Sequence, residues 1–300
     1  MVYYVSKIVE RRENIMDEKY NTEVKKDSKI LTLLFCFWVI VAMLLVQAIA
    51  VYAGIIPKAL EYIKELGPDP AAVTEKLQEY MTGSSVVTVL MFIAEIISIT
   101  VAGIWYYKGY VKKNRENRAY RYGSLKFGGI KSIAFVLCGC ISAWSLAVII
   151  QQIISSIVPQ TAEEVSETLE MALGGNVVLG LISAVVLAPI FEELTVRGII
   201  LQRSKRAFGV IGCVIISAVL FGVFHLNIIQ GLYVLPLGLF WGFVGYRFNS
   251  VIPCIICHMV NNFLGVLIPS FVNPVILFIV TGAVTAFMGV KFGYFTFEKE

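Results

Sequence analysis

Two adjacent carboxylates and an arginine lie near the end of an apolar run that starts at Asn176. Glu192 and Glu193 are followed by Arg197 in the stretch APIFEELTVRG. A charged side chain at membrane depth costs about 2.5–3.5 kcal/mol on insertion scales, so such residues indicate a functional site by default. On a helix, Glu193 and Arg197 are four residues apart and can form an ion pair, whereas Glu192 points about 100° away from Glu193. The spacing therefore separates a supporting carboxylate from one that is free to face a reacting group.

Both histidines of the chain lie in later apolar runs. Phe221 precedes His225 by four residues, and His258 precedes Asn262 by four, so each pair shares one face of a helix. One alternative is that all these polar residues only join helices by hydrogen bonds. Another is that the glutamate pair reaches the membrane surface and is solvated there.

Two catalytic chemistries suit these side chains. In the first, a carboxylate and an imidazole hold a water molecule, the carboxylate acts as general base towards a peptide carbonyl, and a second histidine and an asparagine donate hydrogen bonds to the oxyanion. In the second, glutamate and histidine bind a zinc ion that activates the water. The His-Glu-x-x-His pattern of the common zinc peptidases is absent, and the histidines are 33 residues apart. Zinc therefore has no local support in the sequence and is kept as the alternative to a reaction without a cofactor.

The composition indicates that membrane helices must position these residues. Of the 300 residues, 58% are apolar and 15% are charged, with a mean hydropathy of +0.78. A soluble domain has roughly 25% charged residues. Apolar runs of 18 or more residues recur along the chain, as in spanning helices. The formal net charge of +4 is small, and we expect a lipid bilayer rather than a nucleic acid as partner.

We expect an all-α polytopic membrane protein with about eight transmembrane helices. The first lies between Lys29 and Lys58 and the last ends near Lys291. The other expected spans are 84–107, 132–158, 176–201, 209–226, 232–246 and 251–268. Residues 58–83 predict an amphipathic extracytoplasmic hairpin with its turn at Gly67-Pro68-Asp69-Pro70. Thr161 and Glu164 have the spacing of a capping box and predict a short surface helix.

The charges predict the orientation. Basic residues collect in 108–131, in 202–208 and at Arg247, whereas 159–175 holds four glutamates and no basic residue. If the N-terminus is cytoplasmic, eight spans place the basic loops inside, as the positive-inside bias requires. We therefore expect an integral protein of a prokaryotic cytoplasmic membrane with both termini in the cytoplasm.

The expected organisation has four parts. They are a polar cytoplasmic tail over 1–29, an N-terminal transmembrane part over 30–175, a catalytic transmembrane core over 176–268, and the last helix with the cytoplasmic C-terminus over 269–300.

Three motifs, in order and each on an apolar helix, resemble the motif set of the CAAX protease and bacteriocin-processing family, which includes type II CAAX prenyl endopeptidases. The motifs are Glu192-Glu193-x-x-x-Arg197, Phe221-x-x-x-His225 and His258-x-x-x-Asn262. The resemblance covers about 176–268. It implies an intramembrane glutamic-type endopeptidase with its site in a membrane cavity, although the family was long described as metalloproteases.

The resemblance also implies a role for each matching residue. Glu192 would activate the water and His225 would help to hold it. His258 and Asn262 would form the oxyanion hole. The supporting residues would be Glu193, Arg197 and Phe221. The substrate would be a membrane-associated or lipidated peptide or protein.

The buried polar residues also suit functions other than proteolysis. A non-proteolytic membrane scaffold or bacteriocin-immunity protein is the main alternative, and a transporter that uses Glu95 and Glu192 for proton coupling is a further one. For Glu95 itself, a hydrogen bond between helices is favoured over a place in the cavity. The Cys254-x-x-Cys257-His258 match to a haem attachment motif lies in an apolar span, and we expect no haem there.

Overall fold

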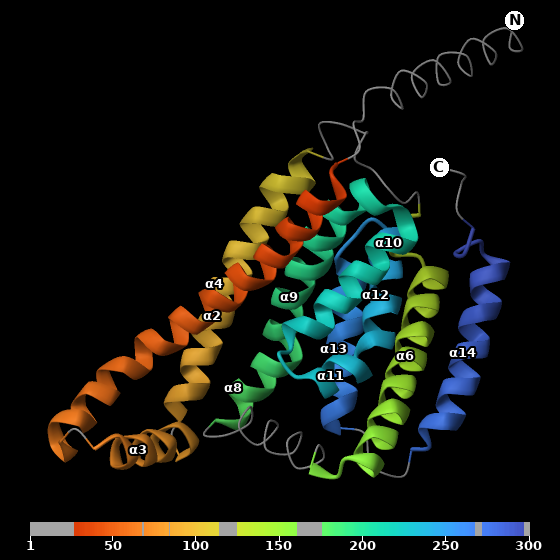
Figure 1. Ribbon diagram of the computed structural model, residues 1–300. Helices are drawn as coiled ribbons and strands as arrows, with labels where there is room; N and C mark the ends of the chain where they lie inside the picture. Colours follow the sequence, from red (N-terminus) through yellow and green to blue (C-terminus); the bar gives the residue numbers. More distant parts are fainter. Residues whose placement is uncertain are drawn as a thin grey trace, which may run out of the picture.

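The computed structural model describes residues 27–67, 69–83, 85–113, 125–160, 176–267 and 272–296. Within these ranges the chain is helical and has no strand (Figure 1). Most of the expected tail over 1–29 and the expected surface helix with Thr161 and Glu164 lie outside the described residues.

The N-terminal part is a long helix pair joined by a short helix (Figure 1). Helix α2 (Lys29–Leu66) packs against α4 (Ser85–Tyr106), and α3 (Pro70–Gly83) connects them. A π-helical turn, η1 (Tyr107–Val111), extends α4.

The extracytoplasmic hairpin expected over 58–83 is not confirmed. Its turn exists, because α2 ends at Leu66 and is followed by Gly67, whose φ of 76° favours glycine. Its first arm, however, is a continuation of the first span, since α2 passes through Pro57 without ending. An ion pair between Lys58 and Glu61, 2.7 Å apart at i,i+3, supports this continuation. Only the second arm, α3, is a separate element.

The candidate catalytic residues begin in a helical stretch whose geometry alternates. Its segments are α8 (Val177–Ile182), π-helical η3 (Ser183–Leu187), α9 (Ala188–Glu193), π-helical η4 (Leu194–Ile200) and α10 (Leu201–Phe224). Pro189 explains the first π segment, because it has no N–H to donate to the preceding turn. Such wide turns are frequent at functional sites.

This 48-residue stretch folds back on itself at Gly209, whose φ of 66° lies in the region that favours glycine. Arg197 Nη2 donates to the Gly238 carbonyl at 3.0 Å, and Ala218 packs against the same glycine. Twenty-one residues separate Arg197 from Ala218, so a straight helix would hold them about 30 Å apart. The arms before and after Gly209 therefore run antiparallel.

Besides helix α6 (Ile130–Ile157), four further helices complete the bundle (Figure 1). They are α11 (Ile228–Tyr233), α12 (Leu235–Arg247), α13 (Ile252–Leu267) and α14 (Pro274–Lys291). The glycines of α12 allow close contact with α10, because a Cβ added to Gly238 would lie 3.0 Å from Ala218 Cα and one added to Gly242 would lie 2.8 Å from Ser217 Oγ. Helix α6 (Ile130–Ile157) lies between α12 and α14.

The expected count of eight spans is not confirmed. Among the described residues, five helical segments are long and apolar enough to cross a membrane: Lys29–Leu66, Ser85–Val111, Ile130–Ile157, Val177–Phe224 and Pro274–Lys291. The folded-back segment contains two of the expected spans. Two others correspond to α12 and α13, which are shorter, with 13 and 16 residues. The fold is that of an integral membrane protein, and large apolar side chains such as Val290 and Phe287 of α14 are well exposed on its outer face.

Candidate active site

The turn at Gly209 brings the first two motifs to one depth. Glu192 lies 17 residues before Gly209 and His225 lies 16 residues after it, so an antiparallel hairpin places them at the same level. The first arm continues as a helix beyond Leu201, the expected end of the fourth span, through the basic residues to the turn. If the membrane depth of Glu192 were counted from Leu201 instead of Gly209, Glu192 and His225 would lie at different depths.

A fully buried ion pair underlies the site. Glu193 Oε1 accepts a hydrogen bond from Arg197 Nη1 at 2.8 Å, and both side chains are inaccessible to solvent. The Arg197 guanidinium also lies over the rings of Phe221, at 4.8 Å, and Trp241, at 5.5 Å. Charges this deeply buried must be paired and hydrogen-bonded, and this network fixes the helix that carries Glu192.

His258 is held between the two glutamates. Its Nδ1 lies 3.0 Å from Glu193 Oε1, so the carboxylate accepts a hydrogen bond from Nδ1–H. Its ring packs against Trp241, with centroids 4.4 Å apart. Its Nε2 lies 3.8 Å from Glu192 Oε2. Glu193 therefore fixes the ring and directs Nε2 towards Glu192.

Glu192 is the carboxylate without a fixed partner. Its side chain is 17% exposed, yet its Oε2 atom is buried and has no hydrogen-bond partner among the described residues. A buried polar atom of this kind requires an explanation, such as a bound water molecule or a functional role. The separation of supporting and free carboxylate expected from the spacing agrees with this geometry.

The ring of His225 is oriented by its own helix. Its Nδ1 lies 2.9 Å from the carbonyl oxygen of Phe221. Because a carbonyl only accepts, Nδ1 carries the proton and Nε2 of the neutral ring is an acceptor. The Phe221 ring meets His225 edge-on, with centroids 4.8 Å apart, and meets His258 in the same way at 5.5 Å. Phe221 thus packs against both imidazoles.

Asn262 is fixed by a carbonyl that Pro189 leaves available. Asn262 Nδ2 donates to the Ala184 carbonyl at 2.7 Å, and Asn261 Nδ2 donates to Asn262 Oδ1 at 2.8 Å. In the i to i+5 pattern of η3, residue 189 would donate to Ala184, but proline has no N–H. An amide nitrogen has two N–H donors, so Asn262 retains a second one.

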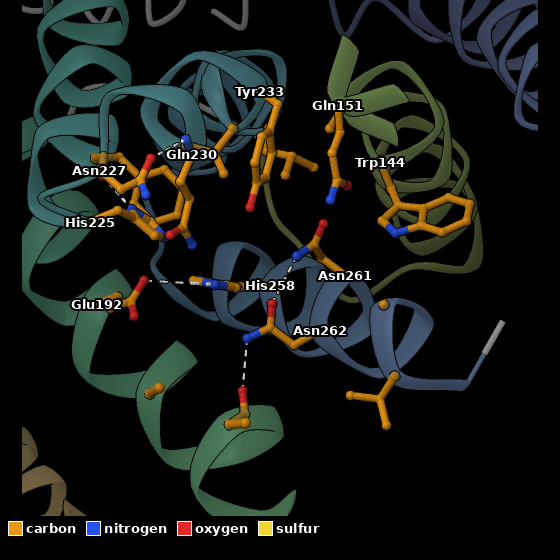
Figure 2. Close-up of a pocket in the computed structure, with 18 of the residues that line it drawn as sticks. Trp144, Gln151, Glu192, His225, Asn227, Gln230, Tyr233, His258, Asn261 and Asn262 are labelled. Atoms are coloured by element: carbon orange, nitrogen blue, oxygen red, sulfur yellow. Dashed lines mark hydrogen bonds and ion pairs between the residues drawn. The ribbon is translucent and has the colours of Figure 1, made fainter. Parts of the chain in front are cut away.

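Four expected catalytic residues line one cavity of about 520 Å³ (Figure 2). They are Glu192, His225, His258 and Asn262. Figure 2 shows these side chains around one space, with those of Gln151 and Tyr233 directed into it from other helices. The expected supporting residues Glu193 and Arg197 lie behind the cavity wall, and Phe221 forms part of that wall.

Glu95 satisfies both roles that the sequence left open. Ser183 donates a hydrogen bond to its carboxyl group, which joins α4 to η3. Glu95 also lines the cavity together with Glu192. It is therefore a helix-joining residue on the cavity wall.

The cysteines of α13 are directed into the protein. The thiol of Cys254 donates to the Trp241 carbonyl at 3.2 Å and that of Cys257 to the Val136 carbonyl at 3.7 Å. All six cysteines are free. Within the described part of the chain, no group of three or more His, Cys, Asp or Glu side chains is arranged to hold a metal ion.

Several site residues were not expected from the sequence. Trp241 packs on His258 and Arg197, and Asn261 binds Asn262. The adjacency of Asn261 to Asn262 was a usable signal. The sequence contains no such signal for Trp241, because an aromatic residue in an apolar helix is usually a packing residue. Gln151, near the end of α6, also lines the cavity.

The comparisons with known proteins identify the same part of the chain. Residues 174–264 match a family model described as type II CAAX prenyl endopeptidase Rce1-like. Searches of curated proteins and of solved structures found no match. The matched residues run from α8 to α13 and contain all three motifs.

Proposed function

We propose that this chain, whose residues 174–264 match the type II CAAX prenyl endopeptidase Rce1-like family model, hydrolyses a peptide bond in a membrane-associated or lipidated peptide or protein. The observation that carries the proposal is the buried Glu192 Oε2, which faces His258 Nε2 across 3.8 Å. This separation is too long for a hydrogen bond, and both residues line the cavity, where a bound water molecule or a substrate can reach them.

In the proposed reaction, Glu192 is the general base. It takes a proton from the bound water while the oxygen attacks the carbonyl carbon of the substrate. The acceptor Nε2 of His225 orients the same water. When the tetrahedral intermediate collapses, the carbon–nitrogen bond breaks and Glu192 returns the proton to the leaving amine. The carboxylate thus serves first as base and then as acid.

Asn262 and His258 are the proposed oxyanion donors. Asn262 keeps one N–H after binding Ala184. In His258, the bond to Glu193 places one proton on Nδ1, so Nε2 donates only when the ring carries a second proton. The second N–H of Asn262 is a fixed donor, and such donors stabilise developing charge without reorganisation.

The remaining motif residues are positioning residues in this proposal. Glu193 orients His258, and Arg197 neutralises Glu193. Phe221 packs against both histidines. None of the three is proposed to touch the reacting atoms.

We propose that the reaction needs no cofactor, with zinc as the alternative. Peptide cleavage by the purified enzyme is therefore expected to continue after exhaustive dialysis against a chelator, with metal content followed by elemental analysis. A chelator-treated sample of a known zinc peptidase provides the control. Loss of activity that returns with added zinc would overturn the mechanism without metal.

The proposed function is tested by comparing membrane-peptide profiles of cells that carry the native chain or the Glu192→Gln variant. Peptides produced by cleavage are expected to disappear in the variant, while their uncut precursors accumulate. Glu75→Gln, an exposed glutamate on α3, is the matched control. Unchanged profiles for Glu192→Gln and His225→Ala would reject the protease and favour a scaffold, an immunity protein or a transporter.

A further inference from the structure

The two ends of the helix bundle differ in charge. Among the described residues outside the buried site, eleven Lys or Arg lie at the end that includes the Gly209 turn: Lys29, Lys108, Lys112, Lys113, Lys126, Lys131, Arg203, Lys205, Arg206, Arg247 and Lys291. The opposite end, which includes α3, carries three lysines: Lys58, Lys64 and Lys76. Because cytoplasmic loops are enriched in Lys and Arg, the Gly209 end is the cytoplasmic end.

The cavity is closed towards this basic end. Most of the residues between the site and the Gly209 turn are buried, and Val196, Ile199 and Leu201 have no solvent access. On α13, Cys254 is equally buried one turn before His258. Among the described residues, therefore, no opening leads from the cavity to the Gly209 end through which a peptide could enter.

The cavity lining extends instead towards the opposite end. It includes Thr88 near the start of α4, Gln151 near the end of α6, Gly180 near the start of α8 and Val266 near the end of α13. It also includes Gln230 of α11, the short helix after the His225 turn. All these positions lie at or near the helix ends on the α3 side.

The chemistry of the lining suits a peptide backbone. The lining contains five amide side chains: Gln151, Asn227, Gln230, Asn261 and Asn262. Amide groups both donate and accept hydrogen bonds, as peptide groups do. No Lys or Arg is among the described lining residues, and two glutamates are, so the lining favours an internal neutral or basic segment over a terminal carboxylate.

From these observations we propose that the site opens to the extracytoplasmic side and cleaves an internal segment of a membrane-anchored or secreted peptide presented there. That a peptide is cleaved here rests on the proposed function. The direction in which the cavity opens rests only on the distribution of charge and on the position of the cavity. It places the substrate on the opposite side of the membrane from the basic loops.

Single cysteines test the direction of opening with a membrane-impermeant maleimide, applied to intact cells and to inverted vesicles. Gln230→Cys reports the cavity, Glu75→Cys reports the α3 side of the membrane, and Lys126→Cys reports the basic side. We expect the first two to be labelled in intact cells and Lys126→Cys only in inverted vesicles. The unsubstituted chain, in which Cys138 is the single half-exposed cysteine, gives the background.

Each other labelling pattern overturns the inference. Labelling of Lys126→Cys in intact cells reverses the orientation. Labelling of Glu75→Cys but not of Gln230→Cys in intact cells means that the cavity does not open on that side. If Gln230→Cys is labelled neither in intact cells nor in inverted vesicles, the cavity opens on neither side of the membrane.

Mapping of the Glu192-dependent cleavage sites tests the substrate class. Sites in extracytoplasmic segments support the inference. Sites in cytoplasmic segments overturn it while the proposed protease stands. If no cleavage depends on Glu192, the proposed function fails and the substrate class fails with it, whereas the labelling still decides the direction of opening.

Discussion

Replacement of Glu192 by glutamine is expected to lower kcat for peptide cleavage by about 10²–10⁴-fold, the contribution typical of general acid–base catalysis. Glutamine has nearly the same shape but cannot take a proton from water. The fold should survive, because Glu192 Oε2 has no hydrogen-bond partner among the described residues and a neutral amide is easier to bury than a carboxylate. The measurements are kcat and KM of the purified variant and its thermal unfolding in detergent.

The split between kinetic and thermal effects is what identifies a base. A large fall in kcat with an unchanged melting temperature supports the role of Glu192. Glu75→Gln makes the same chemical change at an exposed position and should alter neither quantity. If Glu192→Gln retained native kcat, Glu192 would not be the base, and another carboxylate on the cavity wall, Glu95, would have to be considered.

The local pattern of the sequence was sufficient to predict contacts between residues of the same helix. The i,i+4 spacing of Glu193 and Arg197 predicted their ion pair, and the structure contains it at 2.8 Å. The same spacing placed Phe221 against His225, with ring centroids 4.8 Å apart. Helix periodicity fixes such pairs because neighbours three or four residues apart share a face whatever the tertiary fold.

Contacts between helices could not be predicted in this way. The bond from His258 to Glu193 spans 65 residues and that from Asn262 to Ala184 spans 78. Both depend on backbone features without a hydropathy signal: the turn at Gly209 and the carbonyl that Pro189 leaves available. The hydropathy pattern predicts a loop at the basic residues before Gly209, whereas the helix continues through them. The helix therefore extends beyond Leu201, where the sequence pattern ended the fourth span.

The second large effect is expected at Glu193, the residue next to the proposed base. Glu193→Gln should lower the free energy of unfolding by about 3–5 kcal/mol, because it leaves the buried Arg197 charge without a counter-charge. Arg197→Met should also destabilise the protein, since it leaves the buried Glu193 carboxylate without its guanidinium partner. Thermal or denaturant unfolding of the detergent-solubilised variants measures both effects.

The double variant Glu193→Gln with Arg197→Met distinguishes charge imbalance from lost packing. It removes both charges, so it should recover much of the stability that either single change loses. Equal instability of the double variant and of Glu193→Gln would contradict this account. Recovered stability should not restore cleavage, because the substituted amide would present a weaker, uncharged acceptor to His258 Nδ1. A stable but slow double variant would therefore separate the structural role of the ion pair from its role in positioning His258.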